Sequence, residues 1–473
     1  MKRPALALGT ALFANLPQAA GAATLDGAAL TWPLALPFAG LLLSIALGPL
    51  LFSRFWHDHY GKIALAWSAV ALAAIGWLAG GAVVVATFIH AMLGEYLSFI
   101  VLLFALYTVA GGILVSGDIR ATPLSNVTIL ALGTVMASMV GTTGAAMILI
   151  RPIIRANLAR ARNAHVVVFF IILVANVGGA LSPLGDPPLF VGFLRGVDFF
   201  WPTTHLWMQT CIVVLPLLVM FVALDAWRFR VDGNVVAAGG SSPITVQGQV
   251  NLLLIAAIIG TILLSANWRP GIAVDLLGTR LEIQNLTRDG VLIVLALLSL
   301  WLTPEQHRQT NGFTWEPILE VAKLFAGIFV AIIPVVAMLN AGGDGPFGWL
   351  LSAVTTPGGA PREVAYFWLT GVMSAFLDNA PTYLLFFELA GGDPRQLMGE
   401  LSGTLAAISM GAVYMGALTY IGNAPNFMVA AIASERGIRM PGFFGYLLWA
   451  AAILVPLFLL LTILPVAPIL SAH

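Results

Sequence analysis

Two carboxylates lie inside segments that are otherwise apolar. Asp378 interrupts 374-SAFLDNAPTYLLFFELA-390, and Asp186 interrupts 180-ALSPLGDPPLFVGFL-194. An Asp costs about 2.5–3.5 kcal/mol at the centre of a membrane helix, so it must face a cavity, a partner or a bound cation. A desolvated carboxylate can hold a proton in place of a cation. One acid that binds either a cation or a proton is the minimum device for exchange across a membrane.

Neutral oxygens accompany both carboxylates in the sequence. Hydroxyl and amide side chains, with backbone carbonyls freed where Gly and Pro break a helix, suit a hard cation. The predicted ion and proton site consists of Asp378, Asp186, Asn379, Thr382, Asn423 and Asn176. Within that set, the predicted sodium ligands are Asp378, Asn379 and Asn423. The residues predicted to support the substrate site are Thr142, Thr143, Ser182, Thr419 and Asn426.

Each of these residues also has a structural alternative. Asp378 could act only as the N-cap of a helical arm, and Asp186, before two prolines, could do the same. The threonines and asparagines could serve only to satisfy broken backbone. Because Ser or Asn would cap a membrane helix at lower cost, an ion-binding role is favoured for Asp378. For Asp186 the two roles stay equally open.

The composition defines the class of protein. The chain has 473 residues, of which 60% are hydrophobic and 9% charged, and its mean hydropathy is +0.96. Soluble domains carry about 25% charged residues, so this is an integral membrane protein. Lys+Arg and Asp+Glu both number 21, and no basic stripe points to nucleic acid. With Cys211 as the single cysteine and no nucleophile–base or nucleotide motif, neither an enzyme nor a bound cofactor is expected.

The elements that must position these residues are membrane helices. Apolar runs of about 20 residues predict about ten transmembrane helices in an all-α polytopic fold. They lie near 33–53, 63–87, 95–116, 165–194, 205–227, 249–266, 290–303, 317–341, 402–434 and 442–467. Two further segments, 123–158 and 361–391, are too long for one helix and have polar centres, which predicts two re-entrant hairpins. Residues 1–24 read as a signal peptide or an extra helix.

The chain also repeats itself. The segment 141-GTTGAAMILIRP-152 aligns with 377-LDNAPTYLLFFE-388, and 180-ALSPLGDPPLFVGFL-194 aligns with 417-ALTYIGNAPNFMVAA-431. A first repeat at 33–230 therefore contains hairpin 123–158 and broken helix 165–194. A second at 250–467 contains hairpin 361–391 and broken helix 402–434, and a polar linker at 231–249 joins the two. Inverted halves with matching broken helices indicate a secondary transporter whose site lies near the midplane.

Loop charges orient this layout. With non-crossing hairpins and the mature N-terminus outside, thirteen Lys and Arg residues fall inside and six outside, with Lys2 and Arg3 set aside. This bias has the sign that the positive-inside rule predicts. Among them, Arg54, Arg162 and Arg230 are predicted inside and Arg195 and Arg395 outside. The chain is accordingly expected in the inner (plasma) membrane, with a cytoplasmic linker and its C-terminus outside.

The motifs resemble a known family. The stretches 176-NVGGALSPLGDPPLF-190, 376-FLDNAPTYLLFFELAGG-392 and 417-ALTYIGNAPNF-427 look like the sodium:proton antiporter (NhaD-type) and citrate-transporter-like branch of the ion transporter superfamily. The resemblance covers about residues 33–467. It implies a scaffold domain, a mobile domain that carries the hairpins, elevator-type movement and a homodimer. Dicarboxylate transporters of that superfamily carry Ser-Asn-Thr at both tips, whereas the tips here read Thr142-Thr143-Gly144 and Asp378-Asn379-Ala380. This departure argues against a dicarboxylate at this site.

Three function classes follow from the sequence. The leading one is a sodium:proton antiporter, which would exchange sodium ions for protons at the midplane carboxylates. The alternative is cation-coupled transport of a carboxylate such as citrate, or of an inorganic anion. The third, a membrane sensor or scaffold, gives no reason for acids in matching helix breaks. The expected partners are sodium ions, protons, the lipid bilayer and a second copy of the chain.

Overall fold

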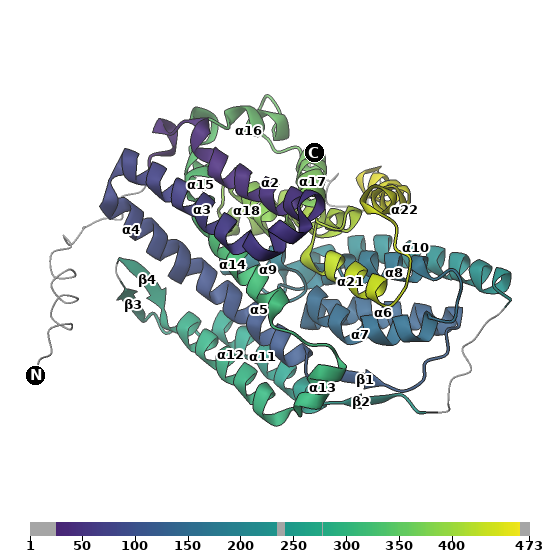
Figure 1. The fold of residues 1–473 in the computed structure, drawn as a ribbon. Coiled ribbons are helices and arrows are strands. Elements are labelled where there is room, and N and C mark those ends of the chain that lie inside the picture. The colour runs from purple at the N-terminus through teal and green to yellow at the C-terminus, as the bar shows by residue number, and fades with distance from the viewer. Residues whose placement is uncertain (1–24, 234–241, 277, 464–473) are drawn as a thin grey trace, which may run out of the picture.

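The computed structural model describes residues 25–233, 242–276 and 278–463, so the predicted signal peptide at 1–24 lies outside the described residues. The chain folds into helices with two short strand pairs (Figure 1). Within the described ranges, nine helices are long and apolar enough to cross a membrane, or ten if the bent pair α14–α15 forms one span. This confirms the predicted polytopic all-α membrane fold. The count includes α6, which the sequence assigned to a hairpin.

One set of helices packs into what we call the scaffold group. Contacts pair α2 with α3, α3 with α14, α5 with α12 and α11 with α12. The members are α2 (Leu36–Leu51), α3 (Ser53–Ala79), α4 (Gly81–Ile89), the π-helical turn η3 (His90–Tyr96), α5 (Leu97–Ala110), α11 (Val250–Asn267), α12 (Ile283–Leu302), α14 (Glu316–Ala331) and α15 (Ile333–Asn340).

The remaining long helices form the hairpin group, of which α6, α7, α8, α10, α21 and α22 lie to the right of α3, α4 and α5 in Figure 1. Contacts pair α6 with α7, α9 with α18, α17 with α20 and α10 with α22. The members are α6 (Pro123–Val140), α7 (Thr142–Asn157), α8 (Ala164–Leu173), η4 (Val177–Leu181), α9 (Pro187–Leu194), α10 (Trp201–Val231), α17 (Glu363–Phe376), α18 (Asn379–Leu389), α20 (Ser402–Met415), η6 (Gly416–Leu418), α21 (Ala424–Glu435) and α22 (Phe443–Ile463).

Short elements complete the described chain. They are η1 (Gly27–Ala29), η2 (Trp32–Ala35), α13 (Glu305–Thr310), η5 (Gly342–Asp344), α16 (Gly348–Val354), α19 (Pro394–Met398) and strands β1 (Leu114–Ser116), β2 (Thr245–Gln247), β3 (Ala273–Leu276) and β4 (Thr279–Glu282). Both strand pairs are antiparallel. Because β2 pairs with β1, the end of the predicted linker 231–249 is tied to the first half of the chain.

Three details in the N-terminal part of the chain differ from the sequence prediction. The helix expected at 63–87 ends at Gly80, whose φ of 86° lies in the region that favours glycine, and α4 starts directly after it. The connection expected near 90 is instead the helical turn η3, so helix runs from Gly81 to Ala110. His57, which falls between the helices predicted at 33–53 and 63–87, lies within α3.

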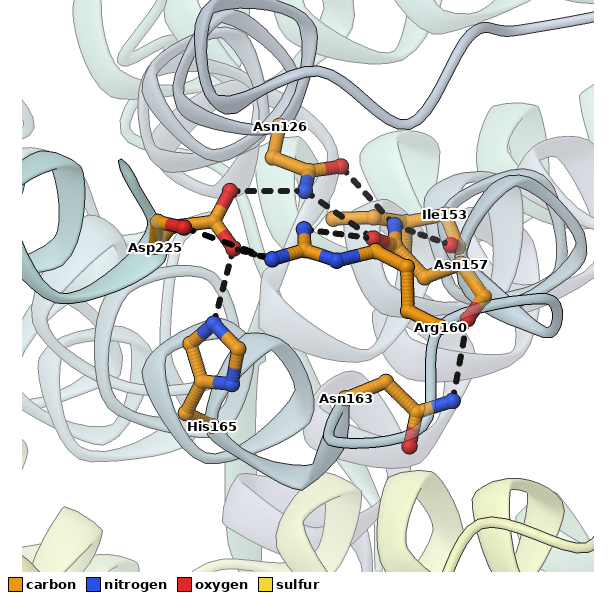
Figure 2. Close-up of polar contacts among 7 residues, drawn as sticks. All are labelled: Asn126, Ile153, Asn157, Arg160, Asn163, His165 and Asp225. Atoms are coloured by element: carbon orange, nitrogen blue, oxygen red, sulfur yellow. Dashed lines mark hydrogen bonds and ion pairs between the residues drawn. The ribbon is translucent and has the colours of Figure 1, made fainter. Parts of the chain in front are cut away.

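The base of the first hairpin is held by a buried polar cluster (Figure 2). Asp225 of α10 is fully buried, and its carboxylate lies 2.6 Å from Arg160 Nη2 and 2.8 Å from His165 Nε2. Asn126 of α6 donates to the same carboxylate over 3.0 Å and also bonds Asn157 at the end of α7. Since charges without partners are costly in the interior, this cluster fixes both hairpin arms to α8 and α10.

Candidate substrate and ion site

The buried carboxylate of Asp186 is the meeting point of four helix N-termini. It is 1% exposed and lies directly before α9. Its Oδ1 accepts from Thr142 Oγ1, at the start of α7, over 3.0 Å and from Asn423 Nδ2, before α21, over 2.9 Å. Its Oδ2 accepts from Asn379 Nδ2, at the start of α18, over 2.6 Å. Asp186 makes no capping bond to its own helix, so its side chain is committed to these three donors.

The backbone permits this convergence because the breaks contain glycine. A Cβ on Gly185 would lie 2.1 Å from the carbonyl oxygen of Gly179, so no other residue fits there. The carbonyl of Gly185 accepts from Thr142 N over 2.8 Å, which joins the first hairpin to the first broken helix. In the second half, a Cβ on Gly422 would lie 2.6 Å from the carbonyl oxygen of Gly416. Both glycine pairs are offset by 237 positions (416 − 179 and 422 − 185).

Hydroxyl groups tie each broken helix to the neighbouring hairpin in the same way. Ser182 donates to the carbonyl of Ser138, and Thr419 donates to the carbonyl of Ala375. Each hydroxyl also accepts from a backbone amide beyond it, Leu184 N or Gly422 N, over 3.1 Å. Ser182 and Thr419 therefore support the breaks, and no contact links either hydroxyl to Asp186. The offset of 237 also pairs Thr142 with Asn379, which corrects by one residue the alignment of the two tips.

Asn176 and Asn426 link the two breaks behind the carboxylate. Asn176 Nδ2 donates to Asn426 Oδ1 over 2.6 Å, and Asn426 Nδ2 donates to the carbonyls of Gly416 and Thr419 over 2.9 Å. Asn423 Nδ2 lies 3.3 Å from Asn176 Oδ1 as well as contacting Asp186. These amides therefore hold the two halves together and satisfy freed backbone, the structural role that the sequence left open.

Asp378 is placed differently from Asp186. Its side chain accepts from Ala380 N over 3.1 Å and so caps α18, and the hydroxyl of Thr382 donates to its backbone carbonyl over 2.9 Å. It is half-buried and lines the same cavity as Asp186. Thr143 also lines that cavity. Asn379 and Asn423, which the sequence grouped with Asp378 as sodium ligands, turn their amide nitrogens toward Asp186 instead.

One oxygen near Asp186 is left for a ligand. Oδ1 of Asn379 is buried, and no donor among the described residues reaches it. A buried amide oxygen without a partner beside a carboxylate is suited to a hard cation. In the part of the chain that the structure describes, no group of three or more His, Cys, Asp or Glu residues could hold a metal. The donor set fits an alkali cation or a proton better than a transition metal.

A cavity of about 450 Å³ lies between the two helix groups. The hairpin group contributes the wall with Asp186, Asp378, the tip of the first hairpin at 141–144 and the helix break at 423–425. The opposite wall comes from α3, α5 and α14 of the scaffold group. It carries Glu316 and Glu320, which the sequence did not place at the site, because only tertiary packing brings α14 opposite the tips. His57 pairs with Glu316 over 3.1 Å where both side chains are exposed.

A polytopic helical protein whose broken helices meet around a buried carboxylate, at the wall of a cavity, has the architecture of a secondary transporter. The chain belongs to the family described as "Putative citrate transport", whose model matches residues 27–466. This supports the citrate-transporter-like part of the resemblance.

Curated relatives agree with this class. A "46 kDa membrane protein" of Mycobacterium leprae is 26% identical over 276 residues, which cover 56% of this chain and 59% of that protein. Proteins of Mycobacterium bovis and Mycobacterium tuberculosis, both called "Uncharacterized transporter", are 25% identical over 332 residues, or 67% of this chain and 71% of each relative.

Proposed function

We propose that the protein is a secondary transporter that couples the movement of a carboxylate such as citrate to a cation or a proton. This was the alternative in the sequence analysis, and the family match now favours it over sodium:proton antiport. The cavity supports the choice, since about 450 Å³ lies within the ~300–1,000 Å³ of small-molecule sites. A monatomic ion needs far less room.

The observation that carries the proposal is the convergence of four helix N-termini on one cavity. Residues at the starts of α7, α9, α18 and α21 all line it. Helix N-termini carry a partial positive charge, which favours an anion. The helix dipole is the main contribution here, because α9 begins with two prolines and the amides of Thr142 and Ala380 are already bonded. Thr143 adds a hydroxyl donor at the start of α7, whereas the hydroxyl of Thr142 already donates to Asp186. The anion would therefore be recognised by helix dipoles and the Thr143 hydroxyl.

Coupling follows from the charge of Asp186. An ionised carboxylate at the cavity wall repels a carboxylate substrate, so the anion binds well only after a cation or a proton has neutralised it. The Oδ1 atom of Asn379 and the oxygens of Asp186 would hold a sodium ion, with Asp378 as a second acid nearby. Binding of cation and substrate would then be mutually dependent, as cotransport requires.

Sodium:proton antiport remains the second candidate, because the lining of the cavity is acidic. Asp186, Asp378, Glu316 and Glu320 all line it, whereas the residues that form the cavity include no Lys or Arg. Such a lining attracts cations without any need for an organic anion. Under either function, the position of the cavity between the groups suggests that the hairpin group moves against the scaffold group. We further propose that the protein lies in the inner membrane and forms a homodimer.

The test is transport by the purified full-length protein in proteoliposomes. Radiolabelled citrate is offered with a sodium gradient, with a proton gradient and with neither, while an internal dye reports pH. We expect citrate to accumulate only with a gradient, Asp186→Asn to abolish accumulation, and the exposed Asp344→Asn to leave it unchanged as a matched control. Sodium-driven proton flux without citrate would instead establish antiport. Absence of both activities would overturn the transporter proposal for these substrates.

A further inference from the structure

A charged triad lies away from the cavity. Arg195, at the C-terminal end of α9, lies between two glutamates. Its Nη1 is 2.5 Å from Glu388 Oε1, and its Nη2 is 3.0 Å from Oε1 and 3.1 Å from Oε2 of Glu95. The Glu388 side chain is 3% exposed, and those of Arg195 and Glu95 are 24% and 21% exposed. The proposed transport chemistry uses none of these residues.

The two ion pairs differ in what they connect. Arg195 and Glu388 both belong to the hairpin group, where α9 packs on α18. Glu95 belongs to the scaffold group, in the turn η3 between α4 and α5. That turn is π-helical, and π-helical turns are rare and occur frequently at functional sites. The pair Arg195–Glu388 is therefore internal to one group, whereas the pair Arg195–Glu95 joins the two groups.

Helix α9 also meets the scaffold group through apolar side chains. Phe99 on α5 and Phe190 on α9 have ring centroids 6.2 Å apart, and Phe99 also stacks on Phe325 of α14. Contacts between apolar rings tolerate changes of position because burial has no preferred direction. A charge-assisted hydrogen bond requires a particular geometry and weakens steeply when its partners shift. The ion pair is thus more sensitive to relative movement than these ring contacts.

The triad and the exposed edge of the cavity are predicted to face opposite sides of the membrane. The cavity reaches the exposed pair His57–Glu316, next to Arg54, which the loop charges place inside. Arg195 is among the residues that the loop charges place outside. In this orientation the structure has a cavity that reaches the inner side while Arg195 and Glu95 join the two groups at the outer side.

We propose that the ion pair between Arg195 and Glu95 is an outer latch, which holds the two helix groups together in this conformation and breaks when the cavity opens to the outside. The proposal rests on the alternating movement of the groups in the proposed function. Glu388 keeps Arg195 in place during the movement, because the arginine stays paired within its own group. Removal of Glu95 should therefore shift the balance toward the other conformation without exposing an unpaired buried charge.

The main test is reversible cross-linking in a Cys211→Ala background. One variant carries Glu95→Cys with Arg195→Cys, which joins the groups, and its matched control carries Arg195→Cys with Glu388→Cys, which joins two residues of one group. A bifunctional methanethiosulfonate is added, transport is measured, and dithiothreitol then reverses the link. We expect the first link to stop transport and its reversal to restore it, while the control link leaves transport at the level of its unlinked form. Continued transport with the first link in place would overturn the latch and leave the transporter proposal intact.

A second measurement does not depend on cross-linking. In Cys211→Ala with Val321→Cys, the reactive position is a half-buried residue of the cavity wall on α14. The rate at which an impermeant thiol reagent labels it from the inner side reports how often the cavity is open there. Adding Glu95→Gln should lower that rate by up to about fivefold, the upper end of what a partly exposed ion pair contributes. An unchanged labelling rate would contradict the latch. Failure of all variants and of the wild type to transport any tested substrate would count against the proposed function instead.

Discussion

Asn423 donates a hydrogen bond to Asp186 over 2.9 Å, although the two residues are 237 positions apart and precede corresponding helices, α9 and α21. The two halves of the chain thus place an acid and an amide at equivalent points, and these meet directly. An acid at both points would bring two like charges together in a buried site, which is costly without a bound cation. In the proposed function, this asymmetry would let a single carboxylate take up or release one positive charge.

The first prediction separates the two acids. In Asp186→Asn, the carboxylate that accepts three hydrogen bonds becomes an amide. The NH2 group of this amide then faces one of the three donors and loses that hydrogen bond. Since a hydrogen bond to a charged group contributes about 1.5–3 kcal/mol, we expect transport to fall at least tenfold. Asp378→Asn should be milder, because its amide oxygen can still accept from Ala380 N. Substrate flux in proteoliposomes is the measurement, and equal loss in both variants would mean that Asp378 also binds an ion.

The second prediction concerns the glycines of the broken helices. Gly185→Ala places a methyl group against the carbonyl of Gly179, which must move and take Asp186 away from its donors. We expect loss of transport together with a destabilisation of about 1–3 kcal/mol, as for other overpacked sites. Gly260→Ala on α11 is the matched control, since a Cβ there meets nothing within 4 Å. Thermal unfolding in detergent and flux are compared, and wild-type behaviour of Gly185→Ala would contradict the close approach.

Part of this architecture was predictable from the sequence. Hydropathy predicts where the helices lie, and Gly and Pro beside polar residues predict where α7, α9, α18 and α21 begin. Both signals depend only on residues that are neighbours in the sequence. The sequence does not show which of the two carboxylates accepts the hydrogen bonds from the other helices. Asp378 looked the better ion ligand, yet it caps its own helix, while Asp186 meets side chains from three other helices. That outcome depends on packing between segments about 40 to 240 residues apart, as does the position of Glu320 across the cavity. The division into two inverted repeats stays a prediction.

The third prediction tests the cluster at the base of the first hairpin. Asp225→Asn removes the carboxylate that pairs with Arg160 and accepts from Asn126 and His165, and it leaves a buried guanidinium without its counter-charge (Figure 2). Breaking a buried pair in this way costs about 3–5 kcal/mol, so the unfolding temperature should fall clearly. Asp344→Asn again serves as the control. A stability equal to wild type would show that the cluster does not hold the hairpin.

The fourth prediction concerns topology. Single cysteines at Arg162 and Arg230, both exposed in the structure, should react only with a thiol reagent on the inner side in a Cys211→Ala background. A cysteine at the exposed Arg395 should react from outside. Arg160 is unsuitable for this purpose because it is buried against Asp225. Labelling of position 162 from outside would mean that 123–158 crosses the membrane, and the inverted-repeat prediction would fail with it.

The last prediction concerns pH. If Asp186 takes up either a cation or a proton, sodium and protons compete for the same oxygens, and the apparent sodium affinity must weaken as pH falls. For one competing proton the loss is at most about tenfold per pH unit, or 1.4 kcal/mol, and it vanishes at pH values where the free site is already deprotonated. Maximal transport at saturating sodium should change less. The measurement is sodium binding to the purified protein by calorimetry across a pH series at constant ionic strength. If the sodium affinity of the wild type is independent of pH throughout the series, Asp186 is not the exchange site. If Asp186→Asn still binds sodium weakly but without the pH dependence, Asp186 is the group that exchanges sodium for a proton.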